Sequence, residues 1–154
     1  MNPAAPGATD ISQMSPREAA DRLFNRVMTS AEAGDSAGAQ GFLPMAMQAY
    51  EMAQPLDLDG LFHLALLQGT AGQHQASLAT AQQMLEMEPN HILALGTAGQ
   101  AAVDLGNTEQ ARSFYQQLLD NIDVEAARQL PEYQGHTNFF ETARSAAQAF
   151  LAGG

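Results

Sequence analysis

The sequence predicts an all-α fold of about three antiparallel helix pairs, closed by a C-terminal capping helix. The main observation is that one apolar pattern occurs twice between residues 58 and 122, with the copies 34 residues apart. A period of 34 residues is typical of a helix-turn-helix repeat. In addition, a glycine-led turn divides each copy. Finally, the chain is 45% apolar but only 6% aromatic, which favours closely packed helices of Ala, Leu and Met.

The two copies of the pattern align position by position. A shift of 34 residues places Leu61 on Leu95, Leu64 on Ala98, Ala65 on Gly99, Gly72 on Gly106, Ser77 on Ala111, Met84 on Leu118 and Leu85 on Leu119. In the later copy Gly106 suits a left-handed helix stop, and Asn107 with Gln110 forms a capping box. Each copy is therefore predicted to contain an apolar helix, a turn and a second helix.

The spacing of these residues, together with Pro89 and Tyr115, resembles the tetratricopeptide repeat (TPR). The resemblance implies a right-handed superhelix of antiparallel helix pairs. In that family a small residue on each helix lets the two axes approach to about 8–10 Å. Ala65 with Ser77, and Gly99 with Ala111, match those small positions. Three positions depart from the family's pattern, namely Gln68, Ala81 and Asp123.

The chain before the repeats divides into a leader and a first helix pair. Residues 1–14 mix Pro, Gly and small residues without periodicity, so a flexible leader is predicted there. The first pair is expected over about 15–55. Ser15 is a suitable N-cap for its first helix because Pro16 follows at the first helical position. One helical repeat domain is therefore predicted over residues 15–151.

The register of this first pair has two solutions. If Gly34 matches the turn glycines of the later units, the pair carries about four extra residues before Pro55. If Pro55 instead matches Pro89, Gly38 takes the place of the turn glycine. The chemistry of Gly34-Asp35-Ser36 favours the first solution, in which Pro44 either kinks the second helix or begins it.

The remaining units are predicted over about 58–91 and 92–122, with Asp57 or Asp59 capping the first of their helices. The last helix of these units is expected to end near Asn121.

The repeat pattern breaks down in the final segment, residues 123–151. A short helix is predicted over 124–130, ended by Pro131, with Tyr133-Gln134-Gly135 after it. Asn138 with Glu141 then forms a capping box that opens a last helix. Because a helical solenoid must cover its exposed end, this last helix is predicted to be a cap.

The TPR resemblance also implies a binding groove. In the family, the first helices of successive units line a concave surface that binds peptides. The matching positions form a predicted peptide-binding groove of Phe24, Met28, Phe62, Leu66, Gln100 and Val103, with Gly69 and Gly96 beside them. Phe62 and Leu66 are the expected anchors for a partner's side chains. The alternative is that the final helix, with Phe139, folds back and fills this groove.

Charge and motifs narrow the classes of function. The net charge is −11, and no basic residue lies between Arg26 and Arg112, so nucleic acid and anionic membranes are poor partners. A basic or amphipathic protein or peptide is a better candidate. The chain has no phosphate-binding, dinucleotide-binding or nucleophile-elbow motif. No two of its four histidines stand at i, i+4, so we expect no catalysis, no cofactor and no metal site.

Neither a signal peptide nor a transmembrane stretch is visible, and a cytoplasmic location is the default expectation, with a removed anchor left open. The leading hypothesis is a non-catalytic scaffold or adaptor that binds a protein segment in its groove. One alternative is a structural repeat module that associates with itself, for example as a homodimer. Another is a small chaperone, since the chain is similar in size and architecture to chaperones of secretion-system translocators.

Overall fold

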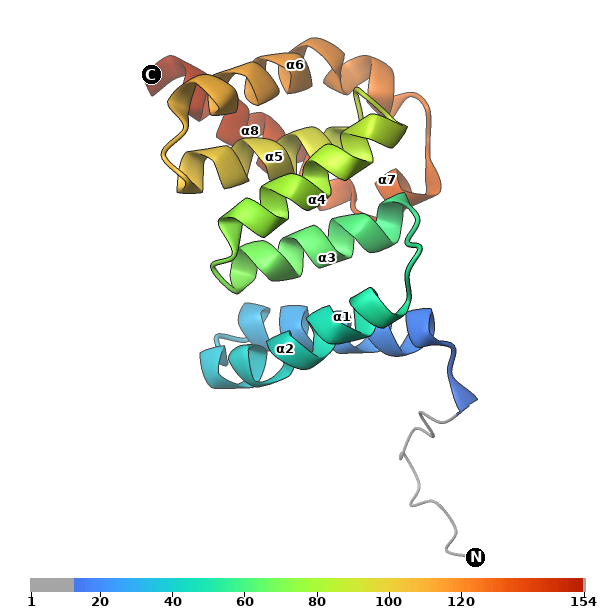
Figure 1. Cartoon of the computed structure of the whole chain (residues 1–154). Coiled ribbons are helices and arrows are strands. Elements are labelled where there is room, and N and C mark those ends of the chain that lie inside the picture. Colours follow the sequence, from blue (N-terminus) through green and yellow to red (C-terminus); the bar gives the residue numbers. More distant parts are fainter. Residues whose placement is uncertain (1–12, 154) are drawn as a thin grey trace, which may run out of the picture. The chain divides into compact units, whose positions relative to one another are not determined.

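The computed structural model describes residues 13–153, and within them it has eight helices and no strand (Figure 1). The predicted all-α class is therefore confirmed. The helices are α1 (Pro16–Glu32), α2 (Ser36–Met52), α3 (Leu58–Thr70), α4 (His74–Met87), α5 (Ile92–Asp104), α6 (Thr108–Ala126), α7 (Pro131–Gly135) and α8 (Thr137–Gly153). None of the helices in this part of the chain combines the length and apolar character of a membrane span. Residues 1–12 of the predicted leader lie outside the described residues.

The chain divides between Leu56 and Asp57 into two compact units. The first unit contains α1 and α2, and the second contains α3 to α8. One domain over 15–151, with the unit boundaries given above, stays a prediction.

The same type of turn joins the two helices in each of the three pairs. Its glycines are Gly34, Gly72 and Gly106, with φ of +77°, +79° and +75°. This left-handed conformation is cheap only for glycine, and it ends the first helix of each pair. In two of the turns the next residue caps the second helix: Asp35 accepts the backbone N–H of Gly38, and Asn107 that of Gln110. The equivalence of the three glycines supports the register that places Gly34 at the turn.

The first unit is a helix hairpin with a core of aliphatic and aromatic side chains. Ser15 Oγ accepts the backbone N–H of Glu18 at 3.1 Å and so caps α1 as predicted. The phenol of Tyr50, which is fully buried, donates to Asp21 on the other helix. Pro44 does not begin a helix, because α2 starts at Ser36 and continues through it.

The second unit contains the two pairs α3–α4 and α5–α6. Asp57 Oδ1 accepts the N–H of Gly60 at 2.8 Å, so Asp57 caps α3. The helices of the first pair meet where Ser77 Oγ donates to the carbonyl of Ala65 at 2.9 Å, at the two small positions that the sequence indicated. In the second pair a Cβ on Gly99 would lie 2.5 Å from the Tyr115 ring, so only glycine allows this approach.

The C-terminal segment differs from the prediction. The separate helix over 124–130 is wrong, because α6 runs without interruption to Ala126. The break comes at Gln129, whose φ is +53°. Pro131 begins α7 instead of ending a helix, since the first helical position needs no N–H donor. Finally, α8 starts at Thr137, so Asn138 is inside the helix and does not cap it.

Candidate functional site

Helix α8 covers part of the surface formed by the first helices of the second unit. It packs against α6 and α5 and lies behind them in Figure 1. At its start the Phe139 ring lies 5.0 Å from the Phe62 ring, centroid to centroid, in an edge-to-face contact. A Cβ on Gly96 would lie 2.7 Å from Phe139, so this glycine makes room for the ring. Near its end Phe150 lies 5.5 Å from the Tyr115 ring, and α8 is thus held by an aromatic contact at each end.

The part of the α3–α5 surface that Phe139 does not cover forms a cavity of about 360 Å³ within the second unit. Its lining includes Leu66 and Gly69 from α3, Gly96 and Gln100 from α5, and Phe139, Thr142 and Ala146 from α8. Polar groups lie to one side: Gln100 Nε2 donates to Asp104 Oδ1 at 3.2 Å, and His74 Nδ1 is 3.5 Å from the other carboxylate oxygen. An apolar cavity of this size with a few polar groups is typical of binding pockets, which measure about 300–1,000 Å³.

The structure brings together only some of the residues predicted for the groove. Leu66 and Gln100 both line the cavity, whereas Val103 is half-buried outside it. Phe62 is buried beneath Phe139, so a partner would reach it only if α8 moved. Phe24 is buried and Met28 half-buried in α1, and their role in a groove stays a prediction.

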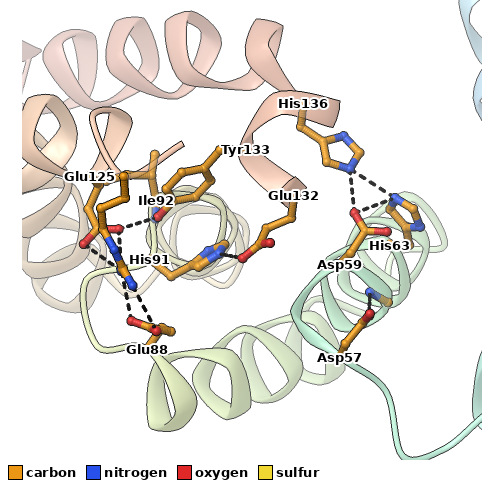
Figure 2. A network of polar contacts seen from close by, with 12 residues as sticks. Asp57, Asp59, His63, Glu88, His91, Ile92, Glu125, Glu132, Tyr133 and His136 are labelled. Carbon is orange, nitrogen blue, oxygen red and sulfur yellow. Dashed lines mark hydrogen bonds and ion pairs between the residues drawn. The ribbon is translucent and has the colours of Figure 1, made fainter. Parts of the chain in front are cut away.

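A polar network, buried at Tyr133 and Glu125, fixes α7 against the start of α5 (Figure 2). The Tyr133 hydroxyl donates to Glu125 Oε2 at 2.7 Å and accepts the backbone N–H of Ile92 at 3.0 Å. Burial raises the pKa of this phenol, and the hydrogen bond to Glu125 adds to the effect. Arg128 in turn bridges Glu125 and Glu88, with Nη1 3.1 Å and 3.0 Å from their carboxylate oxygens. The network joins the C-terminal segment to the junction of α4 and α5.

His91 is fully buried beside this network. Its Nε2 lies 2.9 Å from Glu132 Oε1. Burial lowers the pKa of His91 below the ordinary value of 6.5, although the hydrogen bond to Glu132 opposes this shift. The imidazole is therefore harder to protonate in the folded chain than in the unfolded chain.

We expect the free energy of unfolding to fall as pH drops below about 6.5, because only the unfolded state then takes up a proton at His91. One such proton gives a slope of at most about 1.4 kcal/mol per pH unit. Urea titrations at pH 7.5 and 5.5 measure the loss, which should be smaller in His91→Gln. Between pH 7.5 and 8.5 the free energy of unfolding should change with pH by the same amount in wild-type protein and in His91→Gln. Equal losses in both proteins on acidification would contradict the assignment.

Two histidines and an aspartate converge at the start of α3 (Figure 2). His136 Nε2 lies 3.1 Å from Asp59 Oδ1 and 3.1 Å from His63 Nε2, and His63 Nε2 is 3.6 Å from the same Asp59 oxygen. The spacing of the histidines does not indicate this cluster, because its i, i+4 pair on α3 is a carboxylate with an imidazole. The third member, His136, follows α7 and is 73 residues from His63 in sequence.

Comparison with known proteins links the chain to other proteins through fold alone. No family model and no curated protein matches the sequence. PcrH from Pseudomonas aeruginosa matches with a TM-score of 0.57 and 16% identity, over 94% of this chain and 98% of that one. The TPR domain of Sgt2 from Aspergillus fumigatus matches with a TM-score of 0.53 and 16% identity, over 91% and 83%. The chain has a TPR-like helical-repeat fold.

A third TPR-like structure is the type III secretion chaperone SycD from Yersinia enterocolitica, in complex with a peptide of the translocator YopD. Its TM-score is 0.54 at 12% identity, over 86% of this chain and 94% of that one. The TPR resemblance deduced from the 34-residue period is confirmed at the level of fold, as is the likeness in architecture to secretion chaperones.

Proposed function

We propose that the second unit is a non-catalytic binding module whose cavity receives an apolar side chain of a protein or peptide segment. The observation that carries the proposal is the position of the cavity. It opens between α3 and α5, the first helices of two successive repeats, and contains Leu66 and Gln100 of the predicted groove. SycD, which has the same fold, holds a peptide of its translocator, and this supports a peptide as the ligand.

The charge of the chain supports a basic or amphipathic partner. The net charge is −11, and Asp104 lines the cavity beside Gln100. Acidic side chains at the rim of an apolar pocket attract a segment that carries Lys or Arg next to its apolar anchor. A cytoplasmic location and the absence of catalysis are part of the same proposal.

Peptide selection on the whole chain tests the proposal. Phage-displayed peptides selected on wild-type protein should share an apolar anchor with basic neighbours. Gly69→Leu should then weaken binding of a selected peptide at least about tenfold, equal to 1.4 kcal/mol. A side chain at Gly69 enters the cavity, and its Cβ would meet only Ser77 Oγ at 3.6 Å, so the helix accepts it.

The matched control is Val124→Leu, because Val124 is exposed on α6 away from the cavity. It should leave the affinity unchanged within twofold. Equal affinity of both variants, or a failure to select any peptide, would place the binding function elsewhere. Light scattering over a range of concentrations tests the self-association alternative. A stable dimer whose formation is lost in Gly69→Leu would mean that a second copy occupies the cavity.

A further inference from the structure

We propose that Asp59, His63 and His136 form a binding site for a divalent transition-metal ion of the Zn²⁺ class. The site goes beyond the proposed peptide-binding function and lies outside the cavity. One potential ligand atom from each residue falls within 4.8 Å of the others. Figure 2 shows the two imidazoles and the carboxylate pointing toward a common centre.

The spacing of the three ligand atoms fits a tetrahedral ion. Bonds of about 2.0–2.1 Å to Zn²⁺ separate neighbouring tetrahedral ligand atoms by about 3.3–3.5 Å. The three separations here are 3.1, 3.1 and 3.6 Å. Each of the three separations therefore differs by about 0.3 Å or less from the distance between ligand atoms in a tetrahedral Zn²⁺ site. Small rotations of the side chains would complete the fit.

The chemistry of the three atoms favours the same ion. Two imidazole nitrogens with one carboxylate oxygen suit Zn²⁺ and its neighbours, whereas Mg²⁺ and Ca²⁺ prefer oxygen ligands. His63 Nε2 and His136 Nε2 lie 3.1 Å apart, so in a hydrogen bond between them one nitrogen donates a proton and the other offers its lone pair. When both rings present a lone pair here, an ion can bind the two nitrogens together. An ion accepts both lone pairs and that of Asp59 at once.

Solvent can supply the fourth ligand. His63 is buried, but the side chains of His136 and Asp59 are 21% and 32% exposed. A water molecule can therefore reach the ion, as in sites with three protein ligands. With one carboxylate the site has a net charge of about +1 when Zn²⁺ is bound, and the chain as a whole carries −11.

A bound ion would connect two distant parts of the second unit. Asp59 and His63 belong to the first two turns of α3, while His136 lies between α7 and α8. The His136 ring is also 4.8 Å from the Phe62 ring, and Phe139 follows three residues later. The ion would thus fasten the start of α8 to α3 beside the aromatic contact that covers Phe62.

Metal titration of the tag-free whole chain tests the site. Co²⁺ should bind wild-type protein with one equivalent and give the visible absorption of a tetrahedral complex, and Zn²⁺ should displace it. His136→Gln and His63→Gln should each lower Zn²⁺ affinity about 100-fold or more, since loss of even an outer-shell partner costs about 10–100-fold. His74→Gln is the matched control, because within residues 13–153 His74 lies beside the carboxylate of Asp104 but belongs to no group of three possible ligands. It should bind Zn²⁺ like wild type.

The absence of stoichiometric Co²⁺ binding to wild-type protein, or equal Zn²⁺ affinity of wild type and His136→Gln, would overturn the proposal. Circular dichroism checks that the variants fold. A measurement on wild-type protein removes the dependence on variants: ¹⁵N NMR should show Zn²⁺ shifting the ring nitrogens of His63 and His136. Shifts confined to His74 and His91 would also reject the site.

Discussion

Tyr133→Ala should lower the free energy of unfolding by about 3–5 kcal/mol, the usual cost of deleting a buried aromatic ring. Tyr133 is 3% exposed and packs edge-to-face on Phe140, with the ring centroids 4.8 Å apart. Its loss would also leave the buried Glu125 carboxylate without its 2.7 Å donor, and the Ile92 N–H without its acceptor. Urea denaturation followed by circular dichroism at 222 nm measures the change.

Two further variants divide this cost into its parts. Tyr133→Phe keeps the ring but removes both hydrogen bonds, and should cost about 1–3 kcal/mol. Val124→Ala, at an exposed position of the same segment, should stay within about 0.5 kcal/mol of wild type. A loss below 1 kcal/mol for Tyr133→Ala would mean that α7 is not fixed by this residue.

Gly99→Leu should destabilise the chain by about 3 kcal/mol, at the upper end of the usual cost of overpacking. A Cβ at this position would lie 2.5–2.9 Å from three atoms of the Tyr115 ring. That ring is 2% exposed and also contacts Phe150, so a shift of the ring would disturb α8. Thermal and urea denaturation of purified protein measure the loss.

Gly69→Ala is the matched control for this prediction. It adds a side chain to the first helix of the neighbouring repeat, but its Cβ would meet only Ser77 Oγ at 3.6 Å, an ordinary contact. Replacing glycine by alanine in a helix stabilises it by about 0.5–1 kcal/mol. If Gly99→Leu were as stable as Gly69→Ala, the close approach of α5 and α6 would not depend on glycine.

The repeat architecture could be predicted because its signals are local. Gly72 and Gly106 each end a helix through their own positive φ. Asn107 caps α6 by accepting the backbone N–H of Gln110, three residues later. The small residues Ala65 and Ser77 meet because a tight hairpin joins their helices. Such features depend on short stretches of chain, so periodicity and capping rules are sufficient to find them.

The polar network around Tyr133 and the cluster of His63, His136 and Asp59 were less predictable, because their contacts join residues that are distant in sequence. Tyr133 binds the start of α5 from 41 residues away, and His136 meets Asp59 from 77 residues away. No rule of spacing relates residues so far apart. The break at Gln129 was also invisible, since residues other than glycine rarely adopt a positive φ and the local sequence does not indicate one here. The fold therefore followed from the repeats, whereas the C-terminal segment required the structure.

The position of α8 has a consequence for the order of folding. The pairs α3–α4 and α5–α6 are hairpins between neighbours in sequence, and such local contacts form at a small cost in chain entropy. Phe139 and Phe150, by contrast, rest on Phe62, Gly96 and Tyr115, which belong to three different helices. The surface that receives α8 thus exists only after those helices have assembled. During synthesis α8 leaves the ribosome after α3 to α7, so the nascent second unit passes through a stage in which Phe139 does not yet cover Phe62.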